Sequence, residues 1–186
     1  LRGLGQRFVL NHHVHESTEK ETRWLFGLDK TTPERLTRNR FVNQSSLILV
    51  RDDKKNKETS ADIIRRAFTN KDAMGINPEG EGNKTLHRAL PKSARAIILA
   101  AIHNYNIVCV ATSFKDDTFF MTFDPPLDNE KIREARKILK HDEGRLHQLV
   151  ADHTMARVAQ YLPEEKRGYY SNFQDFISAF EKLTAK

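Results

Sequence analysis

Four cations recur at helical spacing in the segment NEKIREARKILK, residues 129 to 140. At about 100° per residue, Ile132, Ala135 and Leu139 share an inward face. The cations line up beside that face: Arg133, Arg136, Lys137 and Lys140. Such a stripe can contact phosphates, and each contact adds a salt-dependent electrostatic contribution to binding. The alternative is a solvated helix face that Glu130 and Glu134 partly neutralise.

Two further clusters combine cations with a surface that could meet nucleic acid. One lies on an expected early helix and consists of Arg35, Arg38 and Arg40. In the other, cations adjoin two aromatic rings that are able to stack on unpaired bases: Lys166, Arg167, Tyr169 and Tyr170. The alternative for the tyrosines is that their rings pack on a neighbouring helix and expose the hydroxyls.

Three histidines crowd into the segment Asn11-His12-His13-Val14-His15-Glu16. If the segment is a strand, His13 and His15 point the same way, as metal-binding histidines do in endonucleases that nick DNA with a tyrosine. Tyr169 or Tyr170 would then supply the nucleophile. A solvent-exposed histidine cluster without a metal is the favoured interpretation, because this pattern arises readily by chance.

The remaining reactive side chains favour structural roles. Cys109 is the one cysteine of the chain and stands in the apolar segment IVCVATSF, which predicts a buried thiol. His153 shares the helix face of Leu146 and Val150, which predicts a hydrogen-bonded core histidine. The loop GINPEGEGNKT lacks the spacing of a phosphate-binding loop. No motif predicts a cofactor.

The elements that position these groups are clearest between Ser93 and Lys140. The hydrophobic period predicts a helix (SARAIILAAI), a strand (IVCVATSF), a turn at Lys115, a second strand (TFFMTFD), and the basic helix after Pro126. The apolar run LILVR at 47–51 predicts another buried strand. We therefore predict an α+β fold: a small mixed sheet that includes a central β-hairpin and the strand at 47–51, flanked by helices, with a helical C-terminal third.

The other segments complete this expected architecture. Helices are expected at 17–28 and 33–42, within an N-terminal helical extension over residues 1–44. A helix from Ser60, a surface loop at 70–83 and a helix from Thr85 follow. We then expect a helix from 128 to about 161, bent near Gly144, and an amphipathic helix at 171–183 whose aromatic stripe docks on the core. All of residues 1–186 would form a single domain, excised from a longer protein.

Composition limits the function classes. The formal charge of +6 is concentrated in residues 1–90, which hold 17 Lys and Arg against 12 Asp and Glu, and it permits binding to nucleic acid. The longest apolar run is far shorter than the roughly 20 residues that cross a bilayer, so no membrane insertion is expected. With a single cysteine, the chain has no internal disulfide, and a cytoplasmic location is the default expectation.

Elements from SSLILVRDD through IHNYN, IVCVATS and FFMTFD to PPLDNEK resemble accessory domains of large polyvalent proteins and relaxases of conjugative mobile elements. The resemblance covers about residues 45 to 140 and lies in the order of elements. The chain departs from the family pattern at Phe114-Lys115-Asp116-Asp117, where a direct hairpin replaces an inserted helix. The resemblance implies an accessory DNA-transfer domain without catalytic residues.

The leading functional hypothesis is a non-catalytic module of a DNA-processing or mobile-element protein. It would bind DNA or RNA, or dock a partner, through the basic helix face. A metal-dependent nickase of single-stranded DNA is one alternative. The other is a protein-interaction or secretion-recognition domain, in which the aromatic stripe at 173–183 or the loop at 74–83 meets a secretion or conjugation protein.

Overall fold

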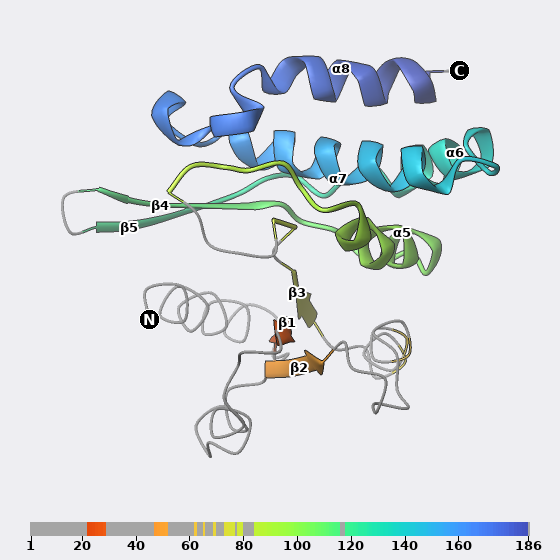
Figure 1. Ribbon diagram of the computed structural model, residues 1–186, viewed down its shortest axis with the longest axis horizontal. Coiled ribbons are helices and arrows are strands. Elements are labelled where there is room, and N and C mark those ends of the chain that lie inside the picture. The colour runs from red at the N-terminus through yellow and green to blue at the C-terminus, as the bar shows by residue number, and fades with distance from the viewer. Residues whose placement is uncertain are drawn as a thin grey trace. The chain divides into compact units, whose positions relative to one another are not determined.

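The computed structural model describes residues 22–28, 47–51, 62, 65, 69, 73–76, 78–79, 84–115 and 118–185. The chain divides into two compact units, residues 1–77 and 78–186, and each is described by itself (Figure 1). No helix among these described residues is both long enough and apolar enough to span a membrane. The α+β class is confirmed, while a single domain over 1–186 and an extension over 1–44 stay predictions.

The first unit contains a three-stranded parallel sheet. Its strands are β1 (Thr22–Leu28), β2 (Leu47–Arg51) and β3 (Ala73–Gly75), in the order β2-β1-β3. The register of β1 on β2 runs from Trp24 opposite Leu47 to Leu28 opposite Arg51. Asp62, Arg65 and Thr69 have helical backbone, as expected of the helix from Ser60.

Three expectations for this unit are wrong. The helix expected at 17–28 is the strand β1 over its last seven residues, because the run Trp24-Leu25-Phe26 suits a strand that pairs with a neighbour on each edge. The strand at 47–51 exists, but it pairs with β1 and does not share a sheet with the hairpin. Ala73–Gly75, expected within a loop, forms β3 against β1.

The second unit is an antiparallel hairpin packed with four α-helices. The hairpin consists of β4 (Val110–Lys115) and β5 (Thr118–Phe123). The helices are α5 (Ala94–Ile102), α6 (Asn129–Ile138), α7 (Glu143–Ala159) and α8 (Phe173–Thr184). Short 3-10 turns lie at Pro91–Ser93, Glu164–Lys166 and Gly168–Tyr170.

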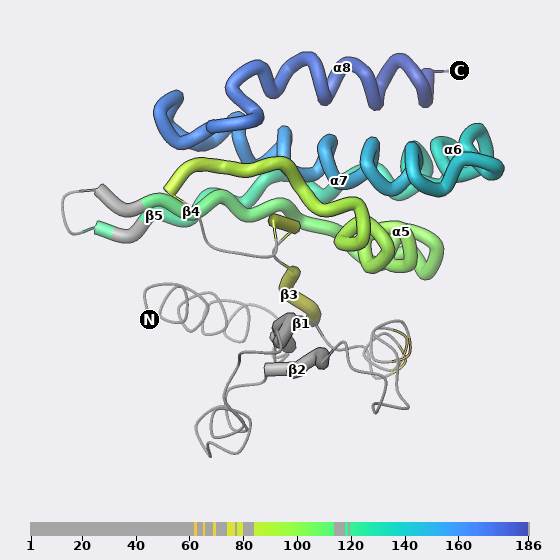
Figure 2. Tube along the Cα trace, in the orientation of Figure 1, coloured from red at the N-terminus to blue at the C-terminus, as the bar shows by residue number. Residues whose placement is uncertain are grey.

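The core of this unit is built around α7. Figure 1 shows α7 between α8 on one side and the layer of α5 and the hairpin on the other. Seven consecutive residues of α7, Val150 to Ala156, are buried. Because a helix turns once in about 3.6 residues, such a run means that neighbours cover every side of it. The trace in Figure 2 follows the same layers without the side chains.

Two boundaries in this unit differ from expectation. The long helix expected from 128 to 161 is two helices, α6 and α7, which separate at residues 139–142. The side chain of Asp142 accepts a hydrogen bond from the backbone N–H of Arg145 and so begins α7 before Gly144. The helix expected from Thr85 is absent over 86–90. Instead, the N–H of Leu86 donates to Lys166 and its carbonyl accepts from Tyr169.

Candidate nucleic-acid interface

The basic helix α6 is fixed at its start by a carboxylate. Asp128 is the N-cap, and its Oδ1 accepts hydrogen bonds from the backbone N–H groups of Glu130 and Lys131 at 2.9 and 3.3 Å. Ile132 and Ala135 are buried, as the helical period predicts. This anchoring sets which side of the helix the cations occupy.

Three of the four predicted cations are exposed at the end of α6. Arg136 and Lys140 are exposed, and neither forms an ion pair or a side-chain hydrogen bond with any residue that the structure describes. The Lys137 side chain is 73% exposed, and its Nζ lies 3.3 Å from Glu134 Oε2. We call Arg136, Lys137 and Lys140 the α6 cation surface. Exposed pairs such as Lys137 and Glu134 are weak, so all three charges remain accessible to a ligand.

The fourth cation, Arg133, has a structural role. One terminal nitrogen donates to the carbonyl oxygen of Ala101 in the last turn of α5, and the other to Glu130 Oε1. Only 25% of the side chain is exposed. A guanidinium also interacts favourably with the negative end of a helix dipole. Arg133 therefore joins α6 to α5, and its predicted contact with nucleic acid stays a prediction.

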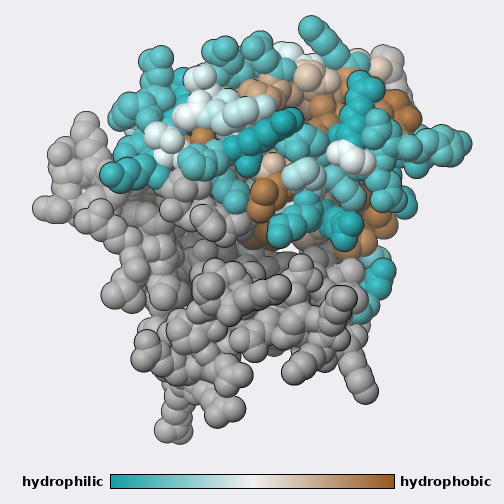
Figure 3. All heavy atoms as spheres, viewed as in Figure 1, coloured by the Kyte–Doolittle hydropathy of each residue, from teal (hydrophilic) through white to brown (hydrophobic). Residues whose placement is uncertain are grey.

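The surface around these helices is mainly polar. Figure 3 shows hydrophilic side chains over most of the visible face of the described residues, with smaller apolar areas between them. Two exposed apolar side chains belong to the ends of these helices, Ile102 of α5 at 37% and Ile138 of α6 at 48%. The α6 cation surface therefore has an apolar neighbour in Ile138.

Tyr170 does not form part of an exposed surface. It is fully buried, its hydroxyl donates to Asp152 Oδ1 at 2.8 Å, and it accepts the backbone N–H of Ala89 at 2.8 Å. Burial raises the pKa of the phenol. The predicted roles of Tyr170 in base stacking or as a nucleophile are therefore corrected: the residue ties the segment 84–90 to α7.

The other members of that cluster divide between surface and core. Tyr169 is 46% exposed, and the guanidinium of Arg88 lies 5.4 Å from the centre of its ring. Lys166 is exposed. Arg167 instead donates from Nε to the carbonyl of Leu162 and lies over the ring of Phe173. Lys166 and Tyr169 are therefore the exposed members of the predicted cluster.

Gly168, between Arg167 and Tyr169, occupies a position that only glycine fits. Its φ is +49°, a conformation that other residues rarely adopt. An added Cβ would lie 2.2 Å from the carbonyl oxygen of Leu86. The close approach of residues 166–169 to Leu86 therefore requires glycine at position 168. The cations and tyrosines on either side of Gly168 flank this structural contact.

Several predicted site residues lie outside the described residues: His13, His15, Arg35, Arg38 and Arg40. Their predicted roles stay predictions. Within the described ranges, no group of three or more His, Cys, Asp or Glu side chains is placed to hold a metal ion.

A buried carboxylate at the end of β5 was not predicted from the sequence. Asp124 is 3% exposed. It accepts hydrogen bonds from Arg157 Nε in α7 at 2.5 Å, and from two residues just after α7, Gln160 Nε2 at 3.1 Å and the Tyr161 hydroxyl at 2.5 Å. This network fixes the end of the hairpin, and the loop that leads into α6, against α7. The pKa of Arg157 is raised by the hydrogen bond to Asp124.

A second buried carboxylate, Asp152, was also missed. It is 6% exposed and accepts from Tyr170, from Gln148 Nε2 at 2.8 Å and from Arg88 at 3.3 Å. Gln148 also donates to the carbonyl of Ala89. The sequence around each aspartate gave no signal for either network, because each one depends on partners far away in the chain.

The thiol of Cys109 is buried, as predicted. Burial, followed by the charge of Asp124, raises its pKa to about 12. Its Sγ lies 3.6 Å from the carbonyl oxygen of Thr154. The group is held as a neutral thiol inside the core, where it packs β4 against α7.

The positions and exposure of the side chains described above are the structural facts that bear on function. Comparisons with protein-family models, with curated proteins and with solved structures find no match to this chain.

Proposed function

We propose that this chain is a non-catalytic accessory module of a DNA-processing protein, and that it binds nucleic acid through the α6 cation surface. The supporting observation is that Arg136 and Lys140 stand exposed beside Lys137, with no carboxylate partner among the residues that the structure describes. Unneutralised cations on a fixed helix end can attract phosphates without reading a base sequence.

The distribution of charge predicts the character of this binding. Residues 91–186 hold 14 Lys and Arg against 13 Asp and Glu, so this part of the chain is almost neutral. Attraction to a polyanion must therefore come from local clustering and not from net charge. We expect modest affinity that falls steeply as salt is added.

The positions of the reactive groups favour binding over catalysis for this unit. The thiol of Cys109, the phenol of Tyr170 and the carboxylate of Asp124 are each buried and engaged with neighbouring groups. Each of these three groups contacts a residue of α7 and helps to hold a neighbouring segment against that helix. Of the two tyrosines that were predicted as the nucleophile of a nickase, Tyr169 is exposed and Tyr170 is buried.

The protein-interaction alternative is less well supported. The aromatic stripe at 173–183 docks on its own core, since Phe180 is 2% and Ile177 is 9% exposed. A partner protein with an acidic face could still meet the α6 cation surface. The mobile-element context of the proposal rests on the resemblance of residues 45 to 140.

The experiment is a binding titration of the full chain with fluorescent single-stranded DNA, double-stranded DNA and single-stranded RNA. The variant R136E/K137E/K140E should lose at least about tenfold in affinity for whichever strand binds best. Equal binding by the variant and the parent chain would show that these cations do not carry the contact.

A further inference from the structure

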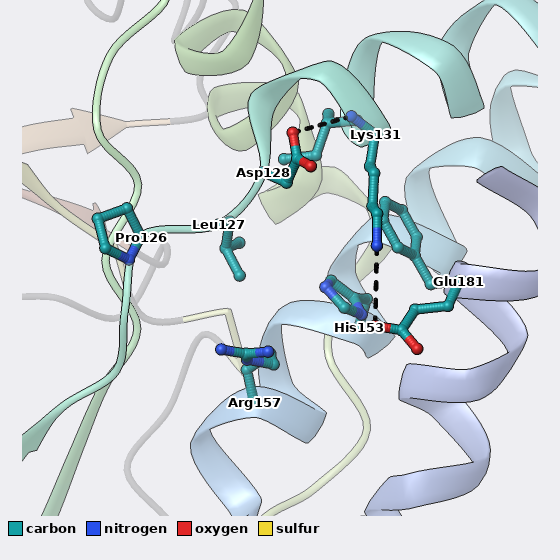
Figure 4. A pocket seen from close by; sticks show the side chains of 9 residues that line it. Pro126, Leu127, Asp128, Lys131, His153, Arg157 and Glu181 are labelled. Carbon is teal, nitrogen blue, oxygen red and sulfur yellow. Dashed lines mark hydrogen bonds and ion pairs between the residues drawn. The ribbon is translucent and has the colours of Figure 1, made fainter. Parts of the chain in front are cut away.

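A small cavity lies among α6, α7 and α8 and is separate from the α6 cation surface. Its volume is about 120 Å³. Its polar lining comes from Asp128, Lys131, His153, Arg157 and Glu181, and the loop before α6 supplies one wall (Figure 4). A cavity of about 150 Å³ can hold a molecule the size of benzene. This one is therefore large enough for a group of four to six heavy atoms.

Hydrogen-bond donors without acceptors converge on this cavity. The Nζ of Lys131 lies 3.8 Å from Glu181 Oε1, an ion pair that is too long for a hydrogen bond. Arg157 uses Nε to bind Asp124, and its terminal nitrogens have no hydrogen-bond partner in the described part of the chain. Figure 4 shows the ammonium of Lys131 near the imidazole of His153, with Arg157 on the other side of that ring.

His153 supplies the third polar atom. The residue is 8% exposed, and its Nδ1 is buried without a hydrogen-bond partner among the described residues. Its ring stacks on Phe180 at 4.1 Å, which fixes its orientation. Burial, with the positive charges of Arg157 and Lys131, lowers the pKa of His153 to about 4, so the imidazole is neutral at pH 7. A neutral imidazole can place its one N–H on the nitrogen that meets a ligand.

The two carboxylates of the lining do not turn the cavity into a cation site. Asp128 Oδ1 is occupied by the two backbone N–H groups that it caps. Glu181 is exposed at the rim and faces Lys131. A cation bound among the inner groups would lie beside the charges of Arg157 and Lys131, which repel it.

We propose that this cavity binds a phosphate group, with Lys131, Arg157 and His153 as the three donors. A phosphate presents three or more acceptor oxygens around one tetrahedral centre, so each of the three donors can meet a separate oxygen. Its negative charge would be attracted by the ammonium of Lys131, whose ion pair with Glu181 is long, and by the terminal nitrogens of Arg157. The source of the group is either free phosphate or the phosphate of a monoester such as a nucleotide.

Titration of the full, isotope-labelled chain with inorganic phosphate, followed by NMR, tests this site. The imidazole nitrogen resonances of His153 should shift and saturate. Lys131→Gln should weaken binding by about tenfold or more, because it removes one charge-assisted hydrogen bond. Glu181→Gln should strengthen binding, since it removes the carboxylate that competes for Lys131. Lys182→Gln, at the next position on α8 and outside the lining, is the matched control and should change nothing.

A parallel titration with a nucleoside 5′-monophosphate distinguishes the two sources. Saturable binding of either ligand that depends on Lys131 supports the site, and the tighter ligand identifies the source. The proposal is overturned if neither ligand shifts His153 or if Lys182→Gln weakens binding as much as Lys131→Gln does. It is also overturned if R136E/K137E/K140E abolishes phosphate binding, because the ligand would then lie on the α6 cation surface.

Discussion

Arg133 of α6 donates a hydrogen bond to the backbone carbonyl oxygen of Ala101, in the last turn of α5. Arg133→Ala should lower the free energy of unfolding by about 1 to 3 kcal/mol, since it leaves a helix-end carbonyl without its charged donor. Arg136→Ala, one turn along and exposed, should stay within about 0.5 kcal/mol of the parent chain. Urea unfolding of both variants measures the difference. Equal stabilities would mean that Arg133 does not join the two helices.

The hydroxyl of Tyr170 joins Ala89 to Asp152 inside the core. Tyr170→Phe keeps the ring and removes only that bridge, so a loss of about 1 to 3 kcal/mol is expected. Tyr169→Phe is the matched control, because Tyr169 is exposed and should tolerate the same change. Thermal unfolding of the two single variants separates them. A Tyr170→Phe chain as stable as the parent would contradict the bridging role.

His153 should make the stability of the fold depend on pH. Its pKa of about 4 in the folded chain lies below the usual value near 6.5, so the unfolded chain takes up the proton first. The free energy of unfolding should therefore fall as the pH drops from about 6.5 to 4, by roughly 3 kcal/mol in total. Urea unfolding at several pH values, compared with His153→Leu, measures this contribution. NMR of the folded chain should show His153 still neutral at pH 5, and a charged ring there would contradict the prediction.

Cys109 should resist thiol reagents in the folded chain. Because its pKa is raised to about 12, almost no thiolate forms at pH 8, and burial excludes the reagent. Iodoacetamide should modify the chain only after denaturant is added, at a single site. Rapid modification under native conditions would show that β4 opens from α7.

Local periodicity predicted most of the second unit. The helices α5, α6 and α8 and the two apolar strands of the hairpin form where their sequence patterns predict them. The hairpin is not covered on both faces, since Phe120 and Phe123 are each 49% exposed. β1 was missed because its partners lie at Leu47–Arg51 and Ala73–Gly75, far along the chain. The segment 86–90 is extended for the same reason, since Lys166 and Tyr169 supply its hydrogen bonds.

The contact surface was predicted in part. Spacing placed the four cations on one side of a helix, and three of them are exposed. The spacing of cations within α6 could not show that Arg133 would donate a hydrogen bond to the carbonyl of Ala101, because that carbonyl belongs to α5. The buried networks of Asp124 and Asp152 were missed on the same ground: an isolated aspartate in a sequence gives no sign of a distant arginine or tyrosine.

The salt dependence of nucleic-acid binding tests the central claim most directly. Affinity is measured from low to moderate salt for the parent chain, for R136E/K137E/K140E, and for the control K84E/K92E/K182E, which makes the same change in net charge at other exposed lysines. Loss of three phosphate contacts should reduce the slope of log K against log salt by roughly 2 to 3. The account predicts that reduction for the α6 variant, and a slope near the parent value for the control. Equal effects of the two triple variants would show that net charge, and not the end of α6, attracts the nucleic acid.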